Sequence, residues 1–586
     1  MLGLKGRGKT TLRKRKKNET TEITLHINTY FAIIYPVQKE KPNLKIGFDF
    51  GMTNSTISFY DAESNGLINF TPDPAANGYI PTIVSYNKNK PDEVLIGNAA
   101  KTKLTAKSFD TYENFKLRLG KRFNEVIEGK NKTPNEVAHD FINKFLALFK
   151  ESHNEIQNIV MTVPATWIRE QSNQTARENI ENIFTSLGYG EEKFCLESEP
   201  IAAAAYFCHA YKIKNDKNTN HGENGYNGFI TVIDYGGGTL DVTLCEVTNG
   251  MSIKVLEQHG FGEDNQTNGR AGVAFDEAVI EKLIADNNLA IEKGSRSFIN
   301  LRNSFEEQKR LQCPKITEQL KYYFVKPAIL EGEVLFSLIY NNDGDEVDVH
   351  CEDLVYCFNK INAPVLNESL VKIQQFYDTY DGIDSSSQNN FRVLLVGGFS
   401  NFYAVEAKVR EFFNSPVGSK DKRFEQPFSL INRSFAISRG AALIARDMII
   451  PEYTCPYNIG YIVVERDIMD QWTDRDVLVI KKGTKIADIK SAVFPPGRCV
   501  KVQHESGKLR IFMDDGRSNN EGRLQAAVDK SVIELFPNIE NTDNEYKVGF
   551  SVNKNLIPTI HISDKYGNVT HTSLSKLLER IGIMQK

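Results

Sequence analysis

The sequence predicts an α/β domain that is followed by a small all-β domain. Two β-rich stretches in the first half each carry an acidic residue and then a glycine turn, in "IGFDFGMTNS" and "TVIDYGGGTLD". Beyond residue 455, apolar and polar residues alternate over short runs that are separated by turns such as "PPG" and "DDG". Short punctuated strands of this kind are typical of a β sandwich. No internal repeat is evident apart from the pair of hairpins.

The composition is that of an ordinary globular chain, with 586 residues of which 40% are hydrophobic and 25% charged. This length suggests roughly three to five domains. The formal net charge of −4 gives no general attraction to nucleic acid or to membranes, and no apolar run approaches the roughly 18 residues that span a bilayer. The eight cysteines, from Cys195 to Cys499, include no C-x-x-C pair. This argues against a zinc site or a disulfide framework and favours the cytoplasm.

The first ten residues, "MLGLKGRGKT", formally match the phosphate-binding P-loop pattern from Gly3 to Thr10. A P-loop needs a buried strand before the turn and a helix after it. Here only two residues precede the turn, and the charged run "TLRKRKKNETTE" follows it. We therefore interpret the match as accidental, with a weaker alternative of a basic nuclear or nucleic-acid tag. Residues 1–45 are expected to be a disordered basic extension. We also expect that the native chain starts later than Met1, near Asn43.

The first glycine hairpin offers groups that suit phosphate and metal. Apolar residues alternate from Ile46, a polar turn follows, and a second β-rich run begins at Thr56. Backbone amides and hydroxyls at such a tip can bind phosphate, and an acid before the tip can hold a metal. A surface hairpin is the alternative of about equal weight. The candidate residues are Asp49, Gly51, Thr53 and Asn54.

The second hairpin repeats this arrangement with three consecutive glycines, which allow the backbone to approach a ligand closely. Two such hairpins can clamp a triphosphate from opposite sides, and their acids can hold Mg²⁺ through its water molecules. The candidate residues are Asp234, Gly236, Gly237, Gly238, Thr239 and Asp241.

Over about residues 46–575, the chain resembles the 70-kDa heat-shock chaperones of the DnaK type, within the actin and sugar-kinase superfamily. The family motif "GIDLGTTNS" corresponds to "GFDFGMTNS", and "DLGGGTFD" corresponds to "DYGGGTLD". Likewise "TVPAYF" corresponds to "TVPATW", and "NEPTAAA" corresponds to "SEPIAAA". The resemblance is strongest in residues 46–250 and 391–445.

The resemblance implies a two-lobed actin-like ATPase domain of α/β class, followed by a small all-β sandwich domain that binds peptide. The implied boundaries are 46–447 for the ATPase domain, 448–456 for a linker and 457–575 for the sandwich. Residues 573–586 are expected to form a short helix in place of the long helical lid of the family.

The implied chemistry is hydrolysis of ATP to ADP with Mg²⁺. Lys116, in "FKLRLG", would orient the attacking water and neutralise the γ-phosphate, and Asp49 and Asp234 would hold Mg²⁺ through waters. The other implied catalytic residues are Glu199, Thr239 and Asp241. Taken alone, Lys116 fits an exposed helix lysine better than a catalytic residue, and Glu199 could simply start an alanine-rich packing helix.

The resemblance places the adenosine side of the site on the helix motif "EEQKR" and on the turn "VGG". The corresponding residues are Glu306, Lys309, Arg310, Gly397 and Gly398. A solvated helix face is the alternative for the first three. The family's serine, arginine and aspartate at the base fall on Cys313, Asn401 and Ser434, so weaker affinity for the base is expected.

The resemblance implies a chaperone that binds unfolded or extended polypeptides, with J-domain and nucleotide-exchange co-chaperones as partners and no nucleic acid or membrane partner. A nucleotide-binding scaffold with weak coupling and a small-molecule kinase are the alternatives. The linker lacks the family's leucines. The family arginine that relays the coupling between the domains lies eight residues after the proline that corresponds to Pro164, and this position is Ser172 here, with Arg169 and Arg177 nearby. Coupling between the two domains is therefore expected to be weak.

Overall fold

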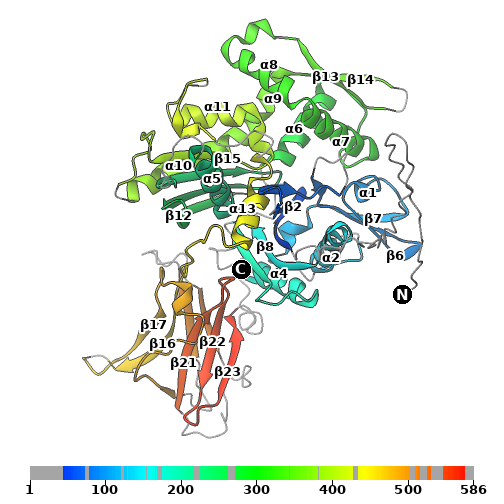
Figure 1. Ribbon diagram of the computed structural model, residues 1–586. Helices are drawn as coiled ribbons and strands as arrows, with labels where there is room; N and C mark the ends of the chain where they lie inside the picture. The colour runs from blue at the N-terminus through cyan, green and yellow to red at the C-terminus, as the bar shows by residue number, and fades with distance from the viewer. Residues whose placement is uncertain are drawn as a thin grey trace, which may run out of the picture. The chain divides into compact units, whose positions relative to one another are not determined.

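Two β-sheets carry the two predicted hairpins, and two helices pack between these sheets (Figure 1). The computed structural model describes residues 44–574 except 62, 73–77, 120–124, 128–129, 154, 165–166, 168–173, 217–224, 262–270, 342–343, 381, 417, 427–432, 467, 502–508, 515–523 and 529–544. The expectations for residues 1–43 and for a helix beyond Leu574 lie outside these described residues.

The first sheet, called sheet I here, has the strand order β3-β2-β1-β8-β9, and β4 pairs with β2. Its hairpin pairs β1 with β2 antiparallel, whereas β1 pairs with β8, and β8 with β9, in parallel. The strands are β1 (Leu44–Phe50), β2 (Asn54–Asp61), β3 (Gly66–Asn69), β4 (Ile80–Pro81), β8 (Ile156–Val163) and β9 (Phe194–Ser198).

An aromatic core forms between sheet I and helix α2 (Pro134–Ser152). Phe141, Phe145 and Phe149 recur at helical spacing and are buried, and their rings contact phenylalanines of sheet I such as Phe48. Thr133 and Glu136 begin the helix with a capping box. The adjoining elements are β5 (Val84–Asn87), β6 (Lys90–Ile96), α1 (Gly97–Lys101), β7 (Phe109–Tyr112), η2 (Phe115–Arg118) and α4 (Gln174–Ser186).

The second sheet, called sheet II here, has the order β12-β11-β10-β15. It repeats the pairing of sheet I, because its hairpin is antiparallel and β10 pairs in parallel with β15. Helices α5 and α13 pack against each other between the two sheets. The elements are α5 (Glu199–Asp216), β10 (Gly228–Tyr235), β11 (Leu240–Thr248), β12 (Ser252–Phe261), β15 (Phe391–Val396) and α13 (Ala436–Ala445).

Sheet II shares its other apolar core with a group of helices and a small hairpin. These elements are α6 (Gly272–Asp286), α7 (Arg296–Leu311), α8 (Cys313–Val325), η4 (Pro327–Ile329), β13 (Val334–Ile339), β14 (Glu346–His350), α9 (Cys351–Cys357), η5 (Phe358–Asn362), α10 (Ala363–Thr379), η6 (Phe399–Asn401), α11 (Tyr403–Phe412) and η7 (Lys422–Phe424).

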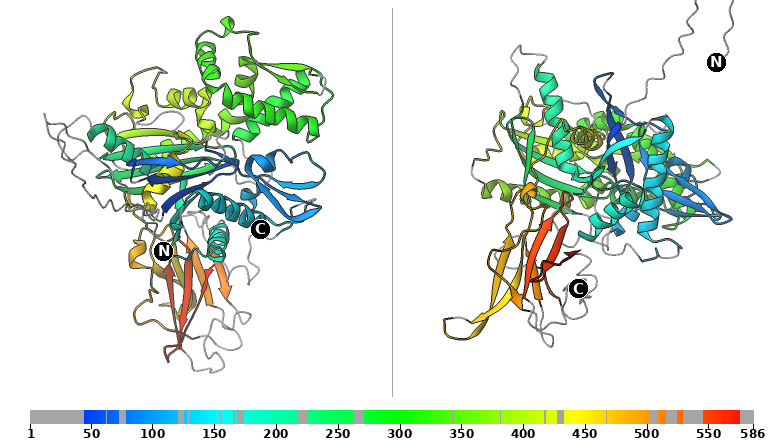
Figure 2. Two further views of the ribbon diagram at one scale, coloured as in Figure 1. Left: turned by 45° about the vertical axis from the view of Figure 1, so that its right-hand side comes forward. Right: turned by 60° about the horizontal axis from the view of Figure 1, so that its bottom comes forward.

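The C-terminal part is all β, as the alternating pattern predicts. Two antiparallel four-stranded sheets, β17-β16-β19-β20 and β18-β21-β22-β23, lie face to face (Figure 2) and share one apolar core. Ile459, Tyr461, Phe550 and Ile560 of the predicted alternation point into it. The elements are β16 (Asn458–Arg466), β17 (Trp472–Ile480), η8 (Ile486–Asp488), β18 (Val500–Lys501), β19 (Leu509–Asp514), β20 (Leu524–Val528), β21 (Glu545–Val552), β22 (Pro558–Ser563) and β23 (Val569–Ser573).

All eight cysteines are free. Within the described ranges, none of the helices combines the length and the apolar character that crossing a bilayer requires.

Candidate active site

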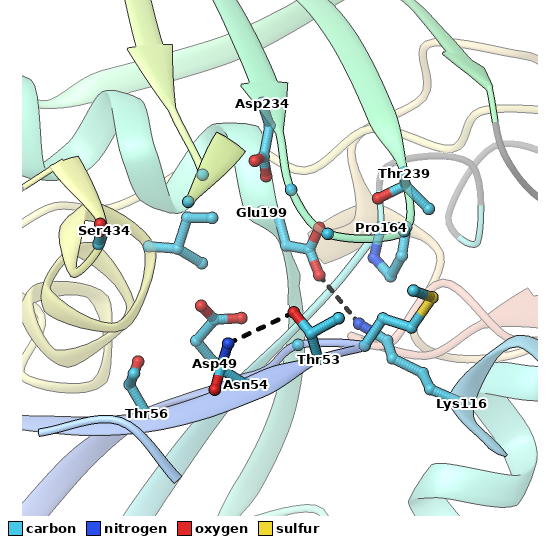
Figure 3. A pocket seen from close by; sticks show the side chains of 18 of the residues that line it. Asp49, Thr53, Asn54, Thr56, Lys116, Pro164, Glu199, Asp234, Thr239 and Ser434 are labelled. Carbon is cyan, nitrogen blue, oxygen red and sulfur yellow. Dashed lines mark hydrogen bonds and ion pairs between the residues drawn. The ribbon is translucent and has the colours of Figure 1, made fainter. Parts of the chain in front are cut away.

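The tips of the two hairpins meet at a pocket (Figure 3). Asp49, Lys116 and Thr53 lie on one side of it, and Asp234 and Thr239 lie on the other. The sequence-predicted residues that line it are Asp49, Gly51, Thr53, Asn54, Lys116, Glu199, Asp234, Gly236, Gly237, Gly238, Thr239, Gly397 and Gly398.

The strand register explains why the acids of both hairpins face the pocket. Asp49 is paired with Thr56 across β1 and β2, and Asp234 is paired with Asp241 across β10 and β11. Both acids lie near the carboxyl ends of their strands, β1 and β10. These strands are central in their sheets, because each pairs with a hairpin partner on one side and with a parallel strand, β8 or β15, on the other. The same local sequence pattern thus produces the same geometry twice.

Two glycines allow the close approach of the hairpins and the neighbouring turn. A Cβ atom on Gly238 would lie 1.9 Å from the sulfur of Met52, so a side chain there would displace the Met52 side chain from the opposite tip. Gly397 has φ +83°, and a Cβ atom on it would lie 2.3 Å from Oδ1 of Asp234. Glycine therefore permits both the left-handed backbone and the short distance.

Lys116 is buried in the wall of the pocket, with its ammonium 3.1 Å from Oε1 of Glu199. The ammonium also donates a hydrogen bond to the carbonyl of Phe50, and the ring of Trp167 lies 5.6 Å away. Only 4% of Lys116 is exposed. The alternative of an exposed lysine is therefore wrong, and the residue lies in the short 3-10 helix η2.

The two hairpin acids are held in an environment that disfavours their charge. Burial, followed by the nearby carboxylate of Glu199, raises the pKa of Asp49 to about 7, although Lys116 and Thr162 oppose this. Burial and the carboxylates of Glu199 and Asp49 raise the pKa of Asp234 well above its usual value. Three carboxylates thus share one ammonium inside a poorly solvated pocket.

This excess of carboxylates fits a divalent cation. Mg²⁺ near Asp49 and Asp234 would favour their ionised forms, against the burial and the neighbouring carboxylates that raise both pKa values. Between residues 44 and 574, as far as these are described, no three acidic, histidine or cysteine side chains lie close enough together to hold a metal directly. The residues therefore fit Mg²⁺ that keeps its waters and binds phosphate oxygens, rather than a cage of protein ligands.

Four of the predicted residues do not line the pocket. Asp241 is buried beside it, opposite Asp234. On α7, Glu306 accepts a hydrogen bond of 2.7 Å from Lys101, and Lys309 forms an ion pair with Asp276. Burial raises the pKa of the Tyr79 hydroxyl, and Arg310, also on α7, is close enough to oppose this rise.

The structure adds residues to the pocket that the sequence analysis did not propose. Tyr79 enters beside β4, and its ring stacks on Phe435 at 4.6 Å between centroids. Ser434, which the sequence analysis placed on the base side only as a departure from the family's aspartate, also lines the pocket, and its Oγ accepts a hydrogen bond of 3.1 Å from Asn401. No motif marks Tyr79, because it reaches the site only when β4 pairs with β2. The other additions are Met52, Thr56, Pro164, Trp167 and Ile437.

Two facing glycine tips beside a buried lysine–carboxylate pair are an arrangement that suits phosphate binding and phosphoryl transfer. Comparison with known proteins agrees with this interpretation. The profile of the family described as "Hsp70 protein" matches residues 45–139 and 125–450. The chain belongs to the Hsp70 family. It is an ATPase with an ATP-dependent chaperone function.

Curated relatives are similar over most of the chain at low identity. The chaperone protein DnaK of Thermotoga maritima is 24% identical over 478 residues, which cover 78% of this chain and 68% of the relative. DnaK of Thermosipho africanus is 25% identical over 411 residues, covering 69% and 59%. DnaK of Metamycoplasma hominis is 23% identical over 547 residues, covering 90% and 78%.

Proposed function

We propose that the pocket between the two hairpins binds ATP with Mg²⁺ and hydrolyses its terminal phosphate. The observation that carries this proposal is the buried pair of Lys116 and Glu199 between the glycine tips. Phosphoryl transfer depends on positioning and on neutralising charge more than on covalent help from the protein. Lys116 would orient the attacking water and neutralise the γ-phosphate, and Glu199 and Asp241 would hold or polarise that water.

The glycine tips would bind the phosphates through their backbone amides. Thr53 and Thr239 would add hydroxyl groups, and Gly51, Asn54 and Gly236–Gly238 would complete the clamp. The adenosine side would be formed by Gly397 and Gly398, which line the pocket, and by Glu306, Lys309 and Arg310 on α7. Glu306 and Lys309 would then exchange their present protein partners for the nucleoside.

Asp49 and Asp234 would hold Mg²⁺ through its waters. Bound Mg²⁺ supplies neutralisation of the charge on the phosphate oxygens. The two acids would keep their carboxylates ionised in its field, against the effect of burial on their pKa values.

We infer the architecture of the family, with a two-lobed actin-like ATPase domain over 46–447, a linker over 448–456 and a β sandwich over 457–575. We propose that the sandwich binds extended apolar polypeptide. Ile468, Met469 and Trp472 support this role, because they are exposed together around the turn between β16 and β17. J-domain and nucleotide-exchange co-chaperones are the proposed partners, and eight free cysteines suit the proposed cytoplasmic location.

The test measures ATP binding and phosphate release by the full chain. Thr53→Val and Thr239→Val should weaken ATP binding, because each removes a hydroxyl group from the phosphate clamp. Thr559→Val, on the β sandwich, serves as the matched control. Unchanged ATP affinity in both hairpin variants would contradict the proposed site.

A further inference from the structure

Tyr79 lines the pocket together with Ser434, away from the proposed catalytic lysine. Figure 3 shows Ser434 and Lys116 on opposite sides of the pocket. Burial raises the pKa of the Tyr79 hydroxyl, and a hydrogen bond with Ser434 opposes this rise, so the hydroxyl lies at the Ser434 side. Because Lys116 would act on the terminal phosphate, Tyr79 lies toward the other end of a bound nucleotide.

The backbone at Tyr79 is attached to the first glycine hairpin. Tyr79 directly precedes β4, which pairs with β2 of that hairpin. Three residues further on, the backbone N–H of Thr82 donates to the carbonyl of Thr53 at 2.8 Å, and its hydroxyl donates to the carbonyl of Gly51 at 2.8 Å. Tyr79 is therefore held at a fixed place relative to the tip that we propose to bind the phosphates.

Phe435, the residue before α13, supports the ring of Tyr79. The two rings stack at 4.6 Å between centroids with an interplanar angle of 22°. Phe435 is only 2% exposed and is not among the described residues that line the pocket, whereas Tyr79 is. Phe435 thus covers one face of the Tyr79 ring on the side away from the pocket. The rest of the ring is left to face a ligand.

The groups that the resemblance places at the base leave a need for such a ring. Asn401 carries a small amide where the family has an arginine, whose planar guanidinium can stack on aromatic rings. This amide donates to Ser434, and neither Asn401 nor Cys313 is among the described residues that line the pocket. Aromatic side chains provide a flat surface on which a base can stack. Tyr79 offers the stacking surface that Asn401 cannot.

Resting on the proposed function, we infer that Tyr79 is a specificity-determining residue of the nucleotide site and that its ring, backed by Phe435, stacks on a purine base. A purine has two fused rings and a pyrimidine one, so a purine gains more contact area on the same tyrosine. Phe435 holds the ring and Ser434 holds the hydroxyl before a ligand arrives. Little side-chain freedom is then lost on binding.

The test compares Tyr79→Ala and Tyr79→Phe with the wild-type chain, by calorimetric titration with the magnesium salts of ATP, UTP and tripolyphosphate. Tripolyphosphate carries the phosphates without a base. We expect Tyr79→Ala to weaken ATP binding roughly tenfold and to change tripolyphosphate binding by less than about twofold, because only the base stacks on the ring. Tyr79→Phe keeps the ring and should bind ATP within about threefold of wild type.

The purine preference is the second readout. The wild-type chain should bind ATP more tightly than UTP, and Tyr79→Ala should narrow this preference. Tyr566→Ala is the matched control and should change neither, because Tyr566 is 66% exposed in a turn of the β domain.

Equal losses of ATP and tripolyphosphate affinity in Tyr79→Ala would overturn the inference, because the ring would then support the pocket as a whole rather than the base. So would a loss in Tyr79→Phe as large as that in Tyr79→Ala, or a preference for ATP over UTP that is absent in wild type or unchanged in Tyr79→Ala. A wild-type chain that binds neither ATP nor tripolyphosphate would instead overturn the proposed function.

Discussion

The ammonium of Lys116 lies 3.1 Å from the carboxylate of Glu199, although the two residues are 83 positions apart in the chain. Lys116 comes from the short 3-10 helix η2 beside sheet I, and Glu199 begins α5, which packs between the two sheets. Both side chains are nearly inaccessible to solvent. This contact brings together the two groups on which the proposed hydrolysis depends.

Replacing Lys116 by alanine should abolish turnover and leave nucleotide binding largely intact. The ammonium acts on charge that develops in the transition state, so its loss should reduce kcat by at least about 100-fold. Calorimetric titration with ATP should show an affinity within about threefold of wild type. Lys565→Ala, on the exposed turn between β22 and β23, is the matched control. Equal turnover in Lys116→Ala and wild type would show that Lys116 is not catalytic.

Replacing Lys9 by alanine should change neither ATP affinity nor turnover. Lys9 is the lysine of the formal P-loop match at the start of the chain, whereas the described residues that line the hairpin pocket lie between Asp49 and Ile437. The same titration and phosphate-release assays give the answer. A loss of ATP affinity in this variant would mean that the opening motif is the nucleotide site.

Gly397→Ala should reduce the free energy of unfolding by more than the strain of an alanine in a left-handed backbone conformation, and it should also weaken ATP binding. An alanine there would be strained at φ +83° and would also press its Cβ atom against the carboxylate of Asp234. Gly382→Ala is the control, because Gly382 has nearly the same φ, +86°, and no atom lies within 4 Å of its Cβ position. The strain alone should cost about 1 kcal/mol of unfolding free energy.

We therefore expect Gly397→Ala to lose clearly more stability than Gly382→Ala in urea unfolding, and to bind ATP more weakly. If the two variants lose the same amount of stability and both bind ATP normally, the close packing of Gly397 against Asp234 does not matter for the site.

The buried carboxyl of Glu197 should make stability fall as the pH rises. Burial raises the pKa of Glu197 to about 7 from an ordinary value of 4.5. The folded chain therefore holds a proton there that the unfolded chain releases. This contribution is fully present below about pH 4.5 and is lost as the pH rises through about 7. The neighbouring groups Tyr453 and Cys195 have raised pKa values, about 12 for Cys195, and stay protonated over this range.

Urea unfolding at about pH 5 and about pH 8 measures this contribution, which should amount to a few kcal/mol at most. Asp49 and Asp276, with pKa values of about 7 and about 6, change stability in the same direction. The comparison is therefore with Glu197→Gln, which keeps a polar side chain of the same shape and cannot ionise. The variant should lose less stability than wild type between the two pH values. An identical loss would show that Glu197 does not titrate in this range.

Both hairpins could be predicted from the sequence, because the residues that form each of them are neighbours in the chain. An alternating strand, an acid and a glycine turn lie within about a dozen residues, and both hairpins form with Asp49 and Asp234 at equivalent positions. The alternation of Ile459, Tyr461 and Phe550 likewise predicted which residues enter the core of the β domain.

The contacts between distant groups at the site could not be predicted from the sequence, because they depend on how the folded chain packs. Tyr79 reaches the pocket through the pairing of β4 with β2, and Glu306 binds Lys101, which is 205 residues away. Glu197 and Tyr453 are separated by 256 positions, and neither belongs to a pattern that predicts a contact. Such pairs depend on how sheets and helices pack, and packing is a property of the whole chain rather than of any short window of it.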